Sequence, residues 1–169
     1  NKCLIYSKRI LIVSNKKNSK KIKNFIKKKK YKNINVVLQP EPKGMGHAVN
    51  LALKKVNTKF SAVIWADQIY LTNKTIKKTM KSFLKKNYLL SFPVYKKKKP
   101  YVLIIKDKKN KFIDIIQTKE INFSIKNGHS DCGFFLFKTN IVRKNLKILI
   151  SKKLLITKKT REIDFLKSF

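Results

Sequence analysis

Two glycines stand where a chain could hold a phosphate group. Gly44 and Gly46 lie in the segment LQPEPKGMGHAV, residues 38–49, between an apolar run and a helical pattern. Glycine lets the backbone approach a ligand closely, and the start of a helix favours negative charge. The pair therefore indicates an anion-binding turn, although a tight turn without any ligand would explain the same two residues.

A carboxylate follows the next apolar run. Asp67 comes directly after Trp65 and Ala66, at the end of the run FSAVIW at residues 60–65. In open α/β sheets, ligands bind outside the carboxyl ends of the strands, and a carboxylate there can hold Mg²⁺ beside substrate phosphates. The alternative is an aspartate that only forms a turn or caps the helix that follows.

A third polar segment, HSDCG at residues 129–133, precedes the apolar run FFLF. Short polar side chains at the mouth of a strand suit hydrogen bonding to a sugar or a ribose. An ordinary turn is the alternative, and it is the more common outcome.

The elements that position these segments follow from hydrophobic periodicity. Short apolar runs predict three strands, at residues 9–14, 34–38 and 60–65. Helical spacing of apolar residues predicts three helices, at residues 18–30, 44–56 and 72–85, the last with Thr72 or Asn73 as its N-cap. Alternating strands and helices predict a parallel sheet with helices on both faces.

After residue 88 strands and helices no longer alternate. Strands without intervening helices are predicted at residues 89–94, 101–107, 112–118 and 132–138. The segment KDKKNK at residues 106–111 predicts a hairpin turn, and short helices are predicted near residues 140–151 and 161–167. The second half therefore adds antiparallel strands to an α/β domain.

Composition limits the class of protein. The 169 residues suit one domain, and no apolar run approaches the length of a membrane span. The two cysteines, Cys3 and Cys132, cannot make a disulfide framework or a zinc site alone, so we expect a protein of the reducing cytoplasm.

The net charge of +35 has two explanations. Lysine near phosphate gives sequence-independent affinity, so a basic nucleic-acid-binding module is one of them. Codon drift in an AT-rich genome is the other, because Asn and Ile are abundant too and only three of the 43 basic residues are arginine. Arginine is the side chain expected where phosphates and bases are gripped bidentately. With only 8 acidic residues, each is a candidate for a specific role.

Taken in order, these segments resemble a family. Gln39, the stretch from Gly44 to Val49, and Asp67 after a strand are similar to the nucleotidyltransferases that make nucleotide sugars. The closest likeness is the uridylyltransferase domain acting on N-acetylglucosamine 1-phosphate, with the motif Q-x-E-x-x-G-T-G-H-A. The likeness continues through residues 100–101, 111–117 and 130–137 and ends weakly at residues 161–164.

The resemblance implies a Rossmann-like nucleotidyltransferase fold, a three-layer α/β/α mixed sheet in one partial domain, 1–169. It further implies a nucleotide-binding half at about residues 1–88 and a sugar-binding half at about 89–169. The implied enzyme is Mg²⁺-dependent: a sugar 1-phosphate attacks the α-phosphate of an NTP, UTP being favoured, and gives an NDP-sugar and pyrophosphate. No specific nucleic acid and no membrane are expected as partners.

Matching positions imply the site. Nucleotide-binding positions are Gln39, Gly44, Met45, Trp65, Ala66 and Asp67; Asp67 is also the catalytic metal ligand, and sugar-binding positions are Gln117 and Asp131. A local packing role is the simpler expectation for His47.

Departures from the family pattern bear on substrate and activity. Family members begin with a glycine-rich loop, L-x-x-G-x-G-T-R, and a lysine that meets the phosphates. No such loop occurs here, so we expect the N-terminal strand–loop–helix unit to be missing from this chain. Met45 replaces the usual threonine, and Gln117 and Asp131 replace a glutamate and an asparagine. A non-catalytic relative with the same fold is therefore a further alternative.

Overall fold

The computed structural model describes residues 2–109, 111–121, 124–154, 156–159 and 161–168. The helices are α1 (Lys16–Lys28), α2 (Met45–Leu53), α3 (Asn73–Lys85) and α4 (Thr139–Ser151). The strands are β1 (Ile10–Ser14), β2 (Ile34–Leu38), β3 (Phe60–Ile64), β4 (Leu90–Ser91), β5 (Val94–Lys98), β6 (Val102–Lys106), β7 (Phe112–Gln117), β8 (Asn127–Asp131) and β9 (Phe134–Lys138). Short 3₁₀ turns are η1 (Lys2–Ile5), η2 (Thr118–Glu120) and η3 (Leu166–Ser168).

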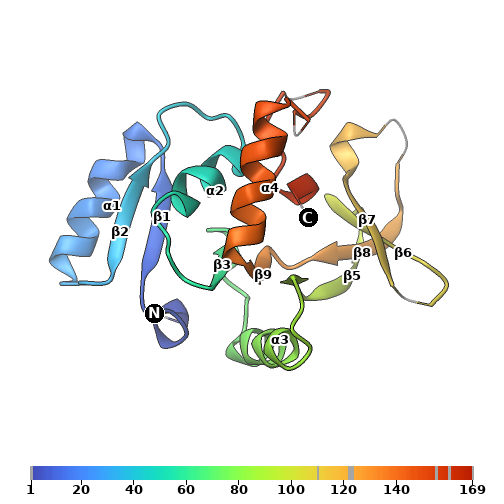
Figure 1. Cartoon of the computed structure of the whole chain (residues 1–169), viewed down its shortest axis with the longest axis horizontal. Helices are drawn as coiled ribbons and strands as arrows, with labels where there is room; N and C mark the ends of the chain where they lie inside the picture. Colours follow the sequence, from blue (N-terminus) through green and yellow to red (C-terminus); the bar gives the residue numbers. More distant parts are fainter. Residues whose placement is uncertain (1, 110, 122–123, 155, 160, 169) are drawn as a thin grey trace.

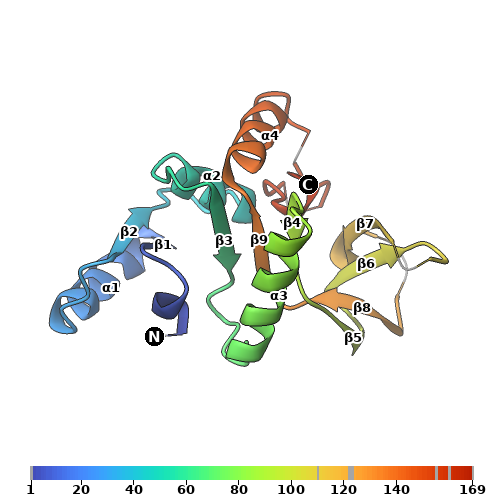
Figure 2. The same ribbon diagram turned by 60° about the horizontal axis from the view of Figure 1, so that its bottom comes forward.

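The described strands form three sheets, in the orders β1-β2, β3-β9-β4 and β5-β8-β6-β7. The first pair is parallel, and the strands of the other two sheets pair antiparallel. Figure 1 shows the sheets side by side, and Figure 2 shows α2 and α4 on one side of the strands with α3 on the other. The predicted three-layer α/β class with a mixed set of strands is confirmed, although the strands do not make one continuous sheet.

The elements of the first half match their predictions to within about three residues. Asn15 caps α1 by accepting a hydrogen bond from Asn18 N at 2.9 Å. Thr72 caps α3 through its hydroxyl, which accepts from Thr75 N at 3.1 Å, as predicted. Each cap satisfies a backbone N–H that the first turn of a helix leaves unpaired, so both helices begin where the sequence places a short polar side chain.

The second half differs from its predictions in three details. The strand expected at residues 89–94 is divided into β4 and β5, because Pro93 lies between them and has no N–H to donate. Strand β8 was not predicted, since its sequence NGHSD is polar, yet it pairs with both β5 and β6. The strand expected at residues 132–138 begins at Phe134, after a glycine with a φ of 62°.

The predicted helix near residues 161–167 is also wrong. Ile163 pairs with Ile156 in an isolated antiparallel bridge, and only the 3₁₀ turn η3 follows. The extended backbone there makes hydrogen bonds to the start of α2, which a helix could not make.

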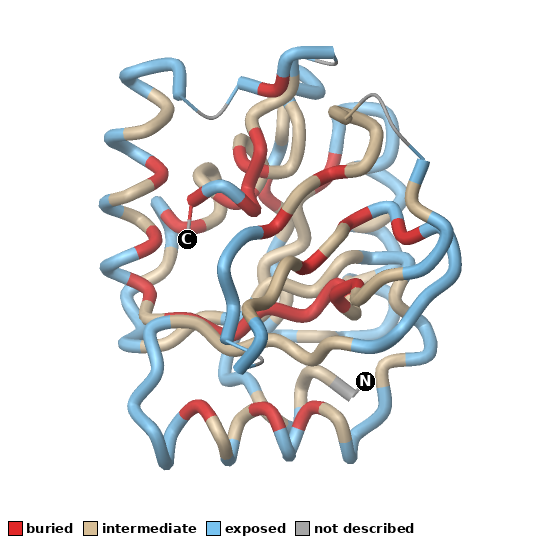
Figure 3. Tube along the Cα trace, turned by 90° about the vertical axis from the view of Figure 1, so that its right-hand side faces the viewer, coloured by how far each residue is buried: buried red, intermediate tan, exposed pale blue. Residues whose placement is uncertain are grey.

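Strand β9 divides the core into two clusters. Its odd residues Phe135 and Phe137 pack with α2, α4 and Phe165, while Phe134 and Leu136 face α3. Figure 3 shows the buried positions of α3 on its inner side. A strand that is covered on both faces carries apolar side chains at successive positions, as β9 does.

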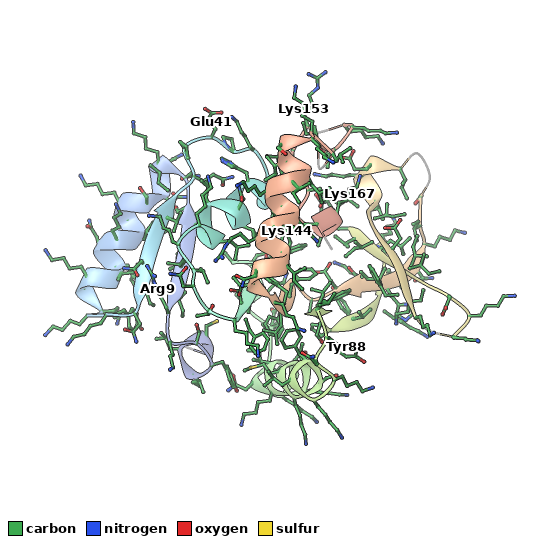
Figure 4. The ribbon with its side chains drawn as sticks, in the orientation of Figure 1. Arg9, Glu41, Tyr88, Lys144, Lys153 and Lys167 are labelled. Atoms are coloured by element: carbon green, nitrogen blue, oxygen red, sulfur yellow. The ribbon has the colours of Figure 1, made fainter. Side chains whose placement is uncertain are left out.

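The charged side chains lie mainly on the outside. Figure 4 shows them projecting on every side of the ribbon, with Lys144 and Lys153 among those labelled. Within the described part of the chain, no helix is both long enough and apolar enough to cross a membrane.

Candidate functional site

The side chain of Gln39 connects the loop before α2 to the start of that helix. Gln39 Nε2 donates to Gly44 O at 3.1 Å and lies 3.3 Å from His47 Nδ1. Gly44 precedes the helix with a φ of 85°, a conformation that favours glycine. Gln39, Gly44 and His47, which the sequence places nearby, therefore form one connected group, and His47 has the local partner expected of it.

The start of α2 is covered by the C-terminal segment. Gly46 N donates to Ile163 O at 2.8 Å, and Ile163 N donates to Lys43 O at 2.9 Å. A Cβ at position 46 would lie 2.7 Å from Ile163 O, which no real Cβ contact tolerates. Close packing of two chain segments thus explains Gly46 without any ligand.

The end of β3 meets a second tight turn. Trp65 N donates to Gly133 O at 2.9 Å, and Asp131 Oδ1 accepts from Gly133 N at 2.5 Å. Asp131 is only 6% exposed, and this burial raises the pKa of its carboxyl group. The segment HSDCG therefore supplies the last residues of β8 and a turn that holds the end of β3.

Cys132 lies in the same turn and is half-buried with a free thiol. Burial, and then the neighbouring Asp131 charge, raise the pKa of this thiol. A thiol that stays protonated is a weak nucleophile, so we assign no chemistry to it.

Asp67 lies on an exposed turn. Its Oδ1 accepts from Gln68 Nε2 at 3.3 Å, and its carbonyl accepts from Ile69 N at 2.9 Å. Ala66 beside it is exposed as well. No ion pair of Asp67 with a lysine or arginine occurs among the described residues, so its carboxylate oxygens are accessible to a cation.

No group of three or more His, Cys, Asp or Glu side chains suited to a metal ion occurs in the described ranges. A site with a single protein carboxylate still suits Mg²⁺, which usually takes one or two carboxylates together with waters and substrate phosphates.

A cavity of about 220 Å³ lies between the two halves of the chain. Its lining residues come from α2, the end of β3, the β6–β7 hairpin and the C-terminal segment: Met45, Trp65, Tyr101, Val102, Gln117, Glu162, Ile163, Asp164, Phe165 and Leu166. Three of the residues predicted for the site, Met45, Trp65 and Gln117, thus meet at one cavity. The others, Gln39, Gly44, Ala66, Asp67 and Asp131, do not line it.

The Trp65 side chain has an unused donor. Its Nε1 atom is buried and has no hydrogen-bond partner among the described residues. Burying an indole N–H without an acceptor is costly, and such groups commonly mark a ligand or a water. The unpaired N–H of Trp65 therefore indicates that a water or a polar ligand binds in or beside this cavity.

Tyr101 and Glu162 line the cavity and were not predicted as site residues, and Lys119, which does not line it, contacts both. Lys119 Nζ lies 3.1 Å from Glu162 Oε2 and 5.7 Å from the centre of the Tyr101 ring. Partial burial lowers the pKa of Lys119, but its hydrogen bonds with Tyr101 and Glu162 outweigh this effect and raise the pKa above its ordinary value. Tyr101 and Glu162 fall in blocks that carry the family resemblance, whereas nothing distinguishes Lys119 from the other lysines in the sequence.

Curated relatives match part of the chain. The bifunctional proteins GlmU of three strains of Buchnera aphidicola subsp. Acyrthosiphon pisum (Tuc7, 5A and APS) are each 37% identical over 95 residues. The matched region is 54% of this chain and 20% of each relative. The chain thus spans a fifth of the length of these relatives.

Solved structures share the fold. HddC from Yersinia pseudotuberculosis superposes with a TM-score of 0.61 at 17% identity, covering 97% of this chain and 65% of that one. UDP-glucose pyrophosphorylase complexed with UDP-glucose superposes with a TM-score of 0.62 at 14% identity, covering 94% and 66%. These similarities concern the fold alone.

The family model described as nucleotidyl transferase matches residues 3–161. The match runs from η1 to the residue before Glu162, and it includes five of the ten residues that line the cavity. The chain therefore belongs to the nucleotidyl transferase family.

Proposed function

We propose that this domain transfers a nucleotidyl group from an NTP to a sugar 1-phosphate, producing an NDP-sugar and pyrophosphate. The observation that carries the proposal is the meeting of Met45, Trp65 and Gln117 at one cavity, from three separate parts of the chain. The family match supports the reaction class. HddC has also been solved with GMP-PN, and the pyrophosphorylase with UDP-glucose.

The cavity suits the sugar better than the nucleotide. Its volume of about 220 Å³ is below the range of about 300–1,000 Å³ for pockets that hold drug-sized ligands. A single sugar ring is the part of the product that fits such a space. Gln117 is 9% exposed and presents an amide, and Trp65 presents the unused N–H, so both can pair with sugar hydroxyl or carbonyl oxygens.

The nucleotide is assigned to the loops outside the cavity and to Met45 and Trp65, the two predicted nucleotide-binding residues in the cavity wall. Gln39 and Gly44 belong to the loop before α2, and Ala66 and Asp67 to the turn after β3. In this assignment residues 1–88 supply the nucleotide-binding half and residues 89–169 the sugar-binding half, including the buried Asp131 that shapes the turn beside Trp65. The cavity draws its lining from both halves, which supports a reaction at their junction.

The proposed chemistry is an in-line displacement at phosphorus. A phosphate oxygen of the sugar 1-phosphate forms a bond to the α-phosphorus, and the bond to the bridging oxygen of pyrophosphate breaks with its electron pair. A bound Mg²⁺ would neutralise charge on the phosphates, with Asp67 as its protein ligand. Lys119 pairs with Glu162 of the cavity wall and so adds positive charge near the cavity. The remaining task of the protein is positioning.

A nucleic-acid-binding role is not favoured. Arg143 donates to Leu53 O and Val56 O, and Arg9 to Lys55 O, so these two arginines tie helices and loops together. Phe134 and Phe135 are buried in the core. Among the described residues the exposed aromatic side chains are those of Phe25, Tyr70, Tyr88, Tyr95, Tyr101 and Phe112. They lie on different helices, strands and turns spread along the chain, and not in one basic, aromatic-rich segment.

Substitution of Asp67 tests the proposal in the complete protein. The assay measures pyrophosphate release from UTP, and then from other NTPs, with N-acetylglucosamine 1-phosphate and Mg²⁺. We expect Asp67→Asn to lower kcat/KM at least about a hundredfold, because it removes the metal ligand. Asp107→Asn is the matched control, since Asp107 lies in the β6–β7 turn and its acceptor role toward Lys109 and Lys111 is kept.

Two outcomes would contradict the proposal in different ways. Near-normal turnover of Asp67→Asn would remove the metal assignment alone. Absence of pyrophosphate release by the unaltered protein with every NTP and sugar 1-phosphate tested would leave a non-catalytic relative of the family. We also propose the cytoplasm as its location, since NTPs and sugar phosphates are available there.

A further inference from the structure

The side-chain amide of Gln39 uses both of its hydrogens inside the protein. Its Nε2 atom donates to Gly44 O at 3.1 Å and lies 3.3 Å from His47 Nδ1. An amide NH₂ group has two hydrogens, so these two partners take both of them. No hydrogen bond to Gln39 Oε1 is found among the described residues, and this oxygen is therefore the atom with which the side chain can meet a ligand.

A backbone carbonyl fixes the orientation of this amide. The oxygen and nitrogen ends of a glutamine side chain have nearly the same shape, so either end could occupy a given place. Gly44 O can only accept a hydrogen bond, and the end of Gln39 that faces it must therefore be the nitrogen. With Nε2 turned toward Gly44 and His47, Oε1 is left for other contacts.

The same contacts assign the hydrogen of the His47 ring. Because a nitrogen of Gln39 donates to it, Nδ1 must accept, which requires a neutral imidazole that carries its hydrogen on Nε2. His47 lies in the first turn of α2, where the helix N-terminus disfavours a positive charge. Glu41 acts against this effect, but its carboxylate pairs with Lys43 at 2.8 Å, and its pKa is lowered chiefly by Lys43 and least by His47.

Both residues are anchored through the backbone. Gln39 N donates to Ser14 O at 2.8 Å, just after β2, and Gly46 N, next to His47, donates to Ile163 O at 2.8 Å. The side chains of Gln39 and His47 are half-buried, so water competes only partly for the contact between them. The amide is thus held in one orientation by two partners that are themselves fixed.

We propose that His47 is a positioning residue for nucleotide selection: it keeps Gln39 Oε1 free as an acceptor, so that the site takes a base with an N–H donor on its pairing edge. Because the proposed function assigns the nucleotide to the loop of Gln39, this role of His47 rests on that assignment. Uracil carries such an N–H, whereas cytosine has an unprotonated ring nitrogen at the same position. Two acceptors that face each other are both left unpaired, and a site built to pair a donor rejects a ligand without one.

Nucleotide binding to the complete protein measures this selection without requiring turnover. Isothermal titration calorimetry in the presence of Mg²⁺ gives the Kd of UTP, of CTP and of 3-methyl-UTP, in which a methyl group replaces the hydrogen of the N–H donor. We expect UTP to bind at least about tenfold more tightly than the other two nucleotides. His47→Ala should remove most of this preference, because it frees one hydrogen of the Gln39 amide to pair with the ring nitrogen of cytosine.

His47→Asn is the matched variant. The Oδ1 atom of asparagine can accept in place of Nδ1, so this variant should retain most of the preference for UTP. In turnover assays with UTP, His47→Ala should raise KM while kcat stays near that of the unaltered protein, because the lost interaction concerns binding of the base. A purely structural role of His47 would instead lower the Tm of both variants and leave the ratio of the Kd values for CTP and UTP unchanged.

NMR of the protein without nucleotide tests the geometry separately. The ¹⁵N shifts of the His47 ring at about pH 8, where histidine is ordinarily neutral, report which nitrogen carries the hydrogen, and the signals lost in His47→Asn identify this ring. We expect the hydrogen on Nε2. Hydrogen exchange of the Gln39 NH₂ group should become several-fold faster in His47→Ala and should change little in His47→Asn.

Three results would overturn the proposal. The first is a hydrogen on Nδ1 of His47 in the unaltered protein, and the second is equal affinity for UTP and CTP. The third is a preference for UTP that His47→Ala leaves intact. Failure of every nucleotide to bind would remove the proposed function together with the role of His47. Selective binding of UTP without any pyrophosphate release would contradict the proposed function alone and would support the role of His47.

Discussion

A side chain at position 46 would collide with Ile163, a residue far from Gly46 in the sequence. The carbonyl of Ile163 both accepts the hydrogen bond of Gly46 N and occupies the place of a Cβ. A glycine that the sequence marks as a candidate for phosphate binding is thus required by packing. From the sequence, the alternatives were an anion-binding turn and a tight turn without a ligand. Packing against Ile163 could not be predicted, because this partner lies in an extended segment predicted as a helix.

Substitution of Gly46 should be costly for stability. Gly46→Ala improves helix propensity by at most about 1 kcal/mol, but it forces the Ile163 backbone to move, and we expect a net loss of about 1–3 kcal/mol in urea unfolding. Gly128→Ala is the comparison, since its Cβ would meet the flexible end of Leu103. Equal losses for the two variants would contradict the packing explanation.

Asp131 links stability to pH. Burial raises the pKa of its carboxyl group above the unfolded value, so its protonated form favours folding below the unfolded pKa of about 3.9, and this stabilisation is lost as pH rises through the folded pKa. Asp131→Asn keeps the acceptor for Gly133 N and removes the buried charge. We therefore expect the variant to gain Tm relative to the unaltered chain at pH 7 and to lose most of that advantage near pH 3.

The comparison is made as a difference between the two proteins at each pH, because repulsion among the lysines affects both alike. A Tm difference that stays constant between pH 3 and pH 7 would show that the carboxyl group does not titrate with folding.

At the scale of elements, segments with a local sequence signal can be predicted, whereas segments formed by long-range pairing cannot. The apolar runs of β1, β2 and β3 identify strands from the sequence alone, and Thr72 identifies the start of α3. The start of α1 was predicted two residues too late, because its cap Asn15 was not recognised in the sequence. β8 could not be predicted, because the residues NGHSD have low strand propensity and form a strand only between β5 and β6. Likewise the pairing of Lys119 with Glu162 joins residues far apart in the sequence and has no local signature.

The cap of α3 allows a direct test of one element. Thr72→Ala removes the hydroxyl that accepts from Thr75 N, and we expect a loss of about 1 kcal/mol in the free energy of unfolding. Thr72→Ser keeps the acceptor oxygen and should retain most of the stability. If serine and alanine were equally destabilising, the methyl group of Thr72 and not its hydroxyl would be the stabilising part.

For the whole molecule, the charge of +35 is an excess spread over the surface. Such a surface attracts any polyanion through counterion release, without reading its sequence. We expect affinity for short DNA duplexes to fall at least about tenfold between about 50 and 200 mM salt, equally for unrelated sequences, as measured by fluorescence anisotropy. A sequence preference that persists at the higher salt concentration would instead support a specific nucleic-acid-binding site.

The bridge between the start of α2 and Ile163 also has a consequence for synthesis on the ribosome. The chain emerges from its N-terminus, so α2 is made well before the residues that cover its first turn. Until those residues emerge, the first turn of α2 lacks its Ile163 partner, and the cavity lacks the wall formed by Glu162 to Leu166. A nascent chain therefore has no finished cavity until residues 162–166 have left the ribosome.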